Sequence, residues 1–216
     1  AIIVGTAGCS TDKTFTIDVE KKPVISFDPN TEGNTSRICI GQAITIKAIT
    51  DQETNMNWTS KDNLSSPVFS TNSSQFTLTP TAARGLENPY KFEVAAKSKT
   101  GKQCESKEIY QIVVFDKATN RIVGDSAKCV ESTLTLESEG TFKSYSWTEV
   151  GASGTVLSSA KTLSIKITED KSFALAITND NGCESHDTFK VKAVPVPKFN
   201  LIPDEKCEGL AATTRV

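Results

Sequence analysis

The sequence predicts an all-β protein built from tandem antiparallel β-sandwich repeats, and three observations support this. Short runs that alternate apolar with small or polar residues recur along the 216 residues, and this period of two is the signature of strands with one buried face. No run of ten or more residues has helical periodicity. The same order of cysteines, tryptophan and turn residues occurs twice, which indicates repeated domains.

The composition argues against several classes of function. The chain carries 24 Lys plus Arg against 26 Asp plus Glu, for a net charge of -2, so it lacks the basic excess that nucleic-acid binding requires. No stretch of apolar residues is long enough to predict a membrane span. A single histidine, His186, leaves little for metal or acid–base sites. We therefore expect a non-enzymatic protein without a cofactor.

The six cysteines include no Cys-x-x-Cys pair. This favours structural disulfides over a zinc or redox site, and disulfides persist in oxidising compartments. We expect an extracellular protein.

One kind of cysteine closes a repeat. Cys104 and Cys183 are each preceded by a glycine-bearing turn and followed by Glu-Ser and an alternating run. Cys9, before the alternating residues 15–19, shows the same feature a third time.

A second kind of cysteine opens a repeat. Cys39, Cys129 and Cys207 each precede a predicted strand or its beginning. Trp58 lies 19 residues after Cys39, and Trp147 lies 18 residues after Cys129. The order is therefore cysteine, tryptophan, cysteine, twice.

These landmarks place the domain boundaries. We interpret residues 1–20 as the end of a preceding repeat, 21–116 and 117–195 as two complete repeats, and 196–216 as the start of a following one. The chain would then be a segment of a longer array, in which neighbouring repeats are the first partners.

Within the two complete repeats the alternating runs predict the strands in order. They are residues 44–48, 56–59, 76–79, 90–94 and 109–115, and then 134–136, 144–148, 163–167, 173–177 and 188–194. Asn181-Gly182 predicts a hairpin with a type I′ turn, in which both central residues have positive φ. The first repeat is longer, and we expect its extra residues around 61–74 and 83–89.

We expect each complete repeat to close its own disulfide, Cys39 with Cys104 and Cys129 with Cys183. Each bond would close a loop of about 55 to 65 residues, for which the chain-entropy model gives roughly 4 kcal/mol of stabilisation.

A second pairing joins successive repeats and uses all six cysteines. Its pairs are Cys9–Cys39, Cys104–Cys129 and Cys183–Cys207. It would connect neighbouring modules rigidly, and the sequence leaves both pairings open.

Trp58 and Trp147 are predicted to lie in the cores of their repeats, because each occurs once at the same place. The alternative is that their rings are exposed and stack on sugars. On the surface, Asp125-Ser126-Ala127 matches the Asp-Ser/Thr-apolar acceptor of bacterial O-glycosylation, and Asp187-Thr188-Phe189 is a looser match. We therefore consider Ser126 and Thr188 as O-glycosylation sites.

Two further groups of residues are not expected to form a catalytic or a calcium site. Ser185, His186 and Asp187 are consecutive on a predicted strand, so they point to alternating faces and cannot assemble a catalytic relay. Residues 180–182 with Asp187 lack a full oxygen set for calcium. Structural calcium elsewhere in the array stays an alternative.

The landmarks together resemble a known class of repeat. Cysteine-x-glycine before a strand, a strand containing tryptophan, Asn-Gly-Cys, and a final alternating strand that runs into the proline-rich residues 194–197 are similar to the PKD-like and Ig-like repeats of very large Bacteroidetes cell-surface proteins. The resemblance spans the chain. Where standard PKD modules have Trp-Asp-Phe-Gly-Asp, this sequence has Trp58-Thr59-Ser60 and Trp147-Thr148-Glu149.

The resemblance implies a function. Such repeats occur in gliding-motility adhesins that are exported by the type IX secretion system, and as spacers in secreted polysaccharide-degrading enzymes. We therefore expect disulfide-stabilised stalk modules of a cell-surface adhesin, with surface polysaccharide as a candidate ligand. The alternative is an accessory or carbohydrate-binding module of a secreted polysaccharide-degrading enzyme.

Overall fold

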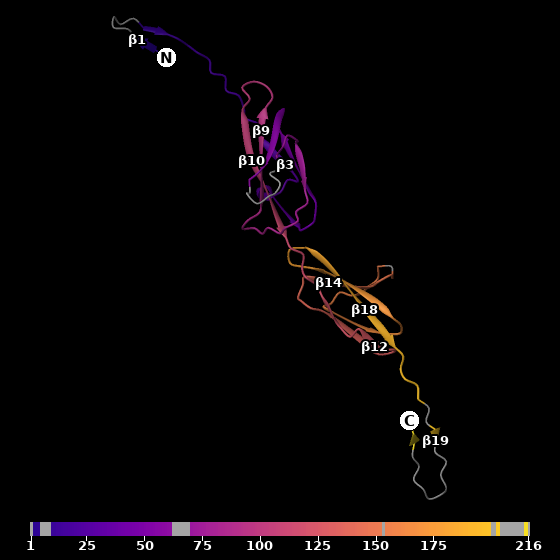
Figure 1. Ribbon diagram of the computed structural model, residues 1–216. Helices are drawn as coiled ribbons and strands as arrows, with labels where there is room; N and C mark the ends of the chain where they lie inside the picture. Colours follow the sequence, from indigo (N-terminus) through magenta and orange to yellow (C-terminus); the bar gives the residue numbers. More distant parts are fainter. Residues whose placement is uncertain are drawn as a thin grey trace, which may run out of the picture. The chain divides into compact units, whose positions relative to one another are not determined.

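The computed structural model describes the backbone of residues 2–4, 10–61, 70–152, 154–199, 202–203 and 214–215, and the side chains of 13–61, 72–152 and 154–199. The chain forms two compact units, Ala1–Asp116 (unit 1) and Lys117–Val216 (unit 2) (Figure 1). Almost all regular structure is strand, so the predicted all-β class is confirmed.

Unit 1 contains ten described strands and one short 3-10 helix. They are β1 (Ile2–Val4), β2 (Ser10–Asp12), β3 (Ile25–Asp28), η1 (Glu32–Asn34), β4 (Thr35–Cys39), β5 (Ile44–Thr50), β6 (Thr54–Ser60), β7 (Ser70–Thr71), β8 (Gln75–Leu78), β9 (Tyr90–Ser98) and β10 (Glu105–Phe115).

Unit 2 also contains ten described strands. They are β11 (Ile122–Gly124), β12 (Ala127–Cys129), β13 (Thr133–Ser138), β14 (Ser144–Glu149), β15 (Val156–Ser158), β16 (Thr162–Lys166), β17 (Lys171–Thr178), β18 (Glu184–Val194), β19 (Ile202–Pro203) and β20 (Thr214–Arg215).

The two units have the same strand order. Unit 1 has a three-stranded sheet β3-β5-β8 and a five-stranded sheet β4-β10-β9-β6-β7, and unit 2 has the matching sheets β11-β13-β16 and β12-β18-β17-β14-β15. Neighbouring strands are antiparallel except for β4 with β10 and β12 with β18, which are parallel. In each unit the first strand is interrupted: its first part, β3 or β11, pairs in the three-stranded sheet, and its second part, β4 or β12, pairs in the five-stranded sheet. Two sheets with this strand order form an Ig-like β-sandwich.

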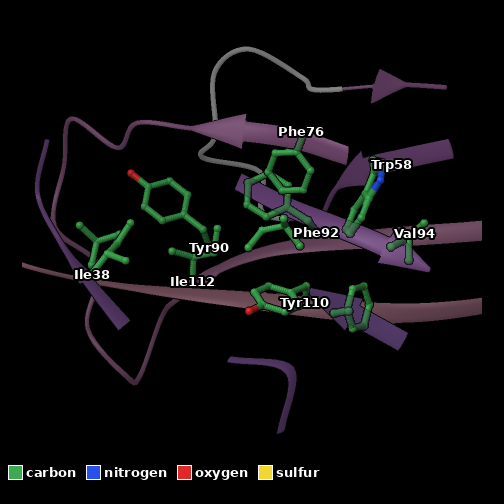
Figure 2. Close-up of a cluster of buried hydrophobic side chains, with 12 residues drawn as sticks. Ile38, Trp58, Phe76, Tyr90, Phe92, Val94, Tyr110 and Ile112 are labelled. Carbon is green, nitrogen blue, oxygen red and sulfur yellow. The ribbon is translucent and has the colours of Figure 1, made fainter. Parts of the chain in front are cut away.

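The core of unit 1 lies between its two sheets (Figure 2). Residues alternate between buried and exposed along β5 and β9, as the period of two predicts. Phe76 lies 4.7 Å from Phe92 and 4.9 Å from Trp58, measured between ring centroids. These contacts join β6, β8 and β9 across the sandwich, so the core depends on both sheets.

The core of unit 2 repeats this arrangement with smaller side chains. Leu134, Leu136 and Leu175 occupy it together with Phe173 around Trp147, and all five are completely buried.

Part of the extra length of unit 1 falls between β8 and β9. Eleven residues separate Leu78 from Tyr90, whereas four separate the corresponding β16 and β17. Arg84 in this segment pairs with Val114 of β10, and its guanidinium lies 4.1 Å from the ring centre of Tyr90. The predicted insertion at 83–89 is thus seen, while most of the other, at 61–74, lies outside the described residues.

Two local expectations are wrong. The β17–β18 hairpin forms, but only Gly182 of its two central residues has positive φ, because the Asn179 carboxamide accepts hydrogen bonds from the backbone N–H of Asn181 and Cys183 and sets another turn geometry. Residues 15–19 form no described strand, and Phe15, Ile17 and Val19 are exposed.

Asp51 attaches the segment before β3 to the β5–β6 turn. Its carboxylate accepts hydrogen bonds of 2.8 Å from the Lys21 ammonium and from the Val24 backbone N–H. Both favour the ionised carboxylate, so they lower the pKa of Asp51 from its ordinary value of 3.8.

This pKa predicts a pH dependence. Because the folded pKa is lowered, the attachment stabilises the fold above pH 3.8 and is lost as the pH falls through the folded pKa. We expect NMR titration to give a pKa for Asp51 below 3.8, and the protection of the Val24 N–H against exchange, relative to its intrinsic rate at each pH, to fall over the same range. In Asp51→Asn that pH dependence should disappear. A titration at or above the ordinary value would contradict this assignment.

Candidate functional site

The two described cysteines of unit 1 lie at opposite ends of β10. Cys104 immediately precedes β10, at the end where the chain enters the unit: its Sγ is 3.9 Å from the Glu20 carbonyl oxygen. Cys39, the last residue of β4, pairs with Phe115, the last residue of β10, at the end where the chain leaves the unit. We call these the entrance and exit positions.

The two described cysteines of unit 2 occupy the same two positions. Cys183 immediately precedes β18, and Cys129 pairs with Val194 at its end. At the entrance end, the Ile122 N–H donates a 2.9 Å hydrogen bond to the Asp187 carboxylate, so the incoming chain is held near the start of β18.

The backbone confirms that the positions are equivalent. The carbonyls of the entrance cysteines, Cys104 and Cys183, each accept a 3.0 Å hydrogen bond from the N–H just beyond the antiparallel register, at Ser98 and Asn179. The carbonyl of each exit cysteine accepts a hydrogen bond from the backbone N–H three residues later. The turn that this bond closes contains a residue with positive φ, Gly41 in unit 1 and Glu131 in unit 2.

The oxidation states show that the predicted pairs within repeats are wrong. Cys39 and Cys183 are disulfide-bonded, whereas Cys104 and Cys129 are free. The physical reason is distance. β10 and β18 have 11 residues each, about 35 Å at roughly 3.3 Å per residue, and a disulfide requires Cα atoms within about 7 Å.

The alternative pairing, which joins successive repeats, is also wrong for the one pair whose cysteines are both described. Its bond between Cys104 and Cys129 is absent, because both thiols are free. Its other two pairs involve Cys9 and Cys207, which lie outside the described residues.

Trp58 and Trp147 are both completely buried. Trp147 Nε1 donates a 3.0 Å hydrogen bond to the Ala160 carbonyl, while Trp58 Nε1 has no partner in the described part of the chain. Buried rings cannot stack on a sugar, so neither tryptophan provides a carbohydrate platform.

Ser126 and Thr188 are both exposed. Ser126 follows β11 and lies at the rim of a hollow of about 320 Å³ whose lining includes Asp170 and Lys190. Thr188 lies in the middle of β18 beside Asp187. The structure therefore leaves both hydroxyls accessible to modification.

Ser185, His186 and Asp187 do not form a relay. His186 is exposed, and its Nε2 lies 3.5 Å from the Glu184 carboxylate, while Asp187 binds the Ile122 backbone instead. Among the residues whose positions are given, no group of three His, Cys, Asp or Glu side chains could hold a metal ion.

Sequence reasoning did not identify a polar hollow of about 600 Å³ in unit 1. Asn55, Asn57 and Lys97 line it from β6 and β9, and Asn57 donates a 3.1 Å hydrogen bond to Asn72. The only available signal was the outward set of alternating positions on two strands whose pairing becomes known from the fold.

No protein-family model matches the chain, and no curated protein has a similar sequence. Within the described residues no helix has the length and apolar character needed to cross a membrane.

The chain is similar to solved structures of Ig-like proteins at low identity. An adhesin of an Antarctic bacterium, described as Ca²⁺-stabilised and ice-binding, is 11% identical with a TM-score of 0.46, over 90% of this chain and 55% of that one. Murine CEACAM1b is 8% identical with a TM-score of 0.34, over 80% of this chain and all of that one. The insect immune protein hemolin is 13% identical with a TM-score of 0.36, over 75% and 45%. The Ig-like character of this chain follows from the strand order of its own two units.

Proposed function

We propose that the chain is a non-catalytic segment of a large secreted cell-surface adhesin, in which Ig-like repeats act as disulfide-linked stalk modules. The observation that carries the proposal is the placement of the chain ends and cysteines. In each unit the chain enters beside one end of the longest strand and leaves beside the other, and a cysteine stands at each end. A module of this form transmits tension along its length.

The sheet topology supports a mechanical role. β4 lies early in unit 1 and runs parallel to β10, which ends where the chain leaves. Pulling on the two ends therefore shears the β4–β10 hydrogen bonds, which must break together rather than one after another. The same holds for β12 and β18 in unit 2.

Residues 1–20 and 196–216 are proposed to belong to a preceding and a following repeat. Phe15, Ile17 and Val19 alternate like Phe189, Val191 and Ala193 of β18, which are at least partly buried in unit 2. Here the three apolar side chains are exposed. The exposure of a strand-like apolar face supports its assignment to a sandwich whose other strands are not among the described residues.

The sequence resemblance extends the proposal to surface attachment in gliding motility and export by the type IX system, with O-glycans at Ser126 and Thr188. The competing function, an accessory module of a polysaccharide-degrading enzyme, loses the two aromatic rings on which sugar stacking would depend, because both are buried.

Single-molecule pulling tests the mechanical role. With disulfides reduced, we expect two unfolding events and a higher force for unit 1, because five residue pairs join β4 to β10 and three join β12 to β18. The events are told apart by the greater length that unit 1 releases.

A control variant, Ile40→Pro, removes the 2.9 Å hydrogen bond from Ile40 N–H to the Phe115 carbonyl and should lower the force of the unit 1 event alone. A higher force for unit 2, or no effect of Ile40→Pro, would contradict the shear geometry and with it the stalk role.

A further inference from the structure

We propose that Cys104 and Cys129 are half-cystines of two further disulfides, each of which takes its partner from another repeat of this kind. Cys104 would bond to an exit-position cysteine and Cys129 to an entrance-position cysteine. This inference rests on the proposed array of repeats and specifies the covalent link between its members.

The two units serve as comparison structures for each other. At the entrance position Cys183 is disulfide-bonded and Cys104 is free, and at the exit position Cys39 is bonded and Cys129 is free. The backbone geometry at each position is the same in both units. Each of the two positions therefore holds a disulfide-bonded cysteine in one of the two units. We assign the free thiols of Cys104 and Cys129 to the same kind of bond, with partner cysteines in other repeats.

The geometry also restricts the partner. A bond between the two described cysteines of one unit is excluded, because about 35 Å of strand separates their positions. Neither cysteine can therefore use the described cysteine at the other end of its own unit. Entrance-to-exit pairing is the arrangement that each successive repeat can continue, since every unit then offers one cysteine at each end.

Both free thiols are accessible to such a partner. Cys129 is exposed and Cys104 is half-buried. The Cys129 carbonyl is held by the Ser132 hydroxyl and N–H, which fixes the turn that carries the thiol. Each bond forms when two thiols lose two protons and two electrons to a disulfide oxidant such as oxidised glutathione, which leaves as two reduced thiols.

The test uses the full chain with Cys9→Ser and Cys207→Ser as background, so that four cysteines remain. We expect two reactive thiols per folded chain, with alkylation at Cys104 and Cys129 and with Cys39 and Cys183 protected until the chain is reduced. Alkylation of Cys39 or Cys183 instead would overturn the assignment of positions.

The decisive measurement is pairing preference. One background variant also carries Cys104→Ser and the other Cys129→Ser, and equal amounts are oxidised together in a glutathione buffer, with one of them isotopically labelled. We expect the heterodimer linked by Cys104 and Cys129 to exceed either homodimer about tenfold, which is about fivefold above random pairing, a preference of roughly 1 kcal/mol. The variant with both substitutions should stay monomeric.

Random pairing, in which the heterodimer is only twice as abundant as either homodimer, would show that the two thiols are merely exposed and would overturn the inference. It would leave the mechanical test untouched, since that test is made with disulfides reduced. Circular dichroism of every variant checks that the sandwiches remain folded, so a loss of pairing is not mistaken for unfolding.

Discussion

Replacing Trp147 by alanine is expected to unfold unit 2 under conditions in which unit 1 stays folded. Trp147 is completely buried between the sheets of unit 2 and donates a 3.0 Å hydrogen bond to the Ala160 carbonyl. Truncating a buried tryptophan costs about 3–5 kcal/mol, and a domain of this size has only about 5–15 kcal/mol of stability in total.

The remaining tryptophan allows the unfolding of unit 1 to be followed separately. In Trp147→Ala the remaining tryptophan is Trp58, so fluorescence follows unit 1 while far-ultraviolet circular dichroism follows both units. We expect denaturation by urea to show an early transition by circular dichroism and a later one by fluorescence. Coincident transitions at the wild-type midpoint would contradict a central role for Trp147.

A matched pair of milder variants separates volume from hydrogen bonding. Trp147→Phe loses ring volume and the bond to Ala160. Trp58→Phe loses similar volume but also removes a buried N–H that has no partner in the described part of the chain, and such a group costs about 1–3 kcal/mol. We therefore expect Trp58→Phe to destabilise its unit less than Trp147→Phe.

The second large effect is expected at Tyr110 of β10. Its ring is completely buried 5.0 Å from that of Phe27, and its hydroxyl lies 2.7 Å from the Ser36 hydroxyl and 3.1 Å from that of Thr31. This hydroxyl joins β10 to the connection between β3 and β4. The network therefore fixes the place where the first strand passes from one sheet to the other.

Two substitutions divide the contributions of this residue. Tyr110→Ala removes ring and hydroxyl and should cost about 3–5 kcal/mol. Tyr110→Phe keeps the ring but leaves the buried Ser36 hydroxyl without this partner, at about 1–3 kcal/mol. Urea unfolding followed by fluorescence in a Trp147→Phe background, in which Trp58 is the remaining tryptophan, measures both. Adding Ser36→Ala to Tyr110→Phe should recover part of the loss, and no recovery would argue against the network.

Much of the fold could be predicted from sequence because a half-buried strand must alternate. Along β13 every second residue is buried, from Leu134 to Ser138, and the same period was readable without coordinates. The tryptophan predicted to lie in the core of each repeat is indeed completely buried, Trp58 in unit 1 and Trp147 in unit 2. The strand class and the repeated strand order follow from local patterns of this kind.

The geometry of the β17–β18 turn was harder to predict from the sequence, because it depends on side chains outside the two central residues of the turn. The Asn179 carboxamide binds two backbone N–H groups of the β17–β18 turn, and this selects a conformation that the Asn181-Gly182 dipeptide alone does not specify. The polar hollow beside Asn55 and Lys97 depends in the same way on which strands become neighbours.

The sequence by itself determined the cysteine pattern, with one cysteine before the first long strand of each repeat and one before the last. Only the tertiary structure decided what that pattern means. β4 runs parallel to β10 and pairs with its far end, which places Cys39 a whole strand length from Cys104. Sequence separation measures the loop a disulfide would close, but the direction of strand pairing decides whether two sulfurs can meet.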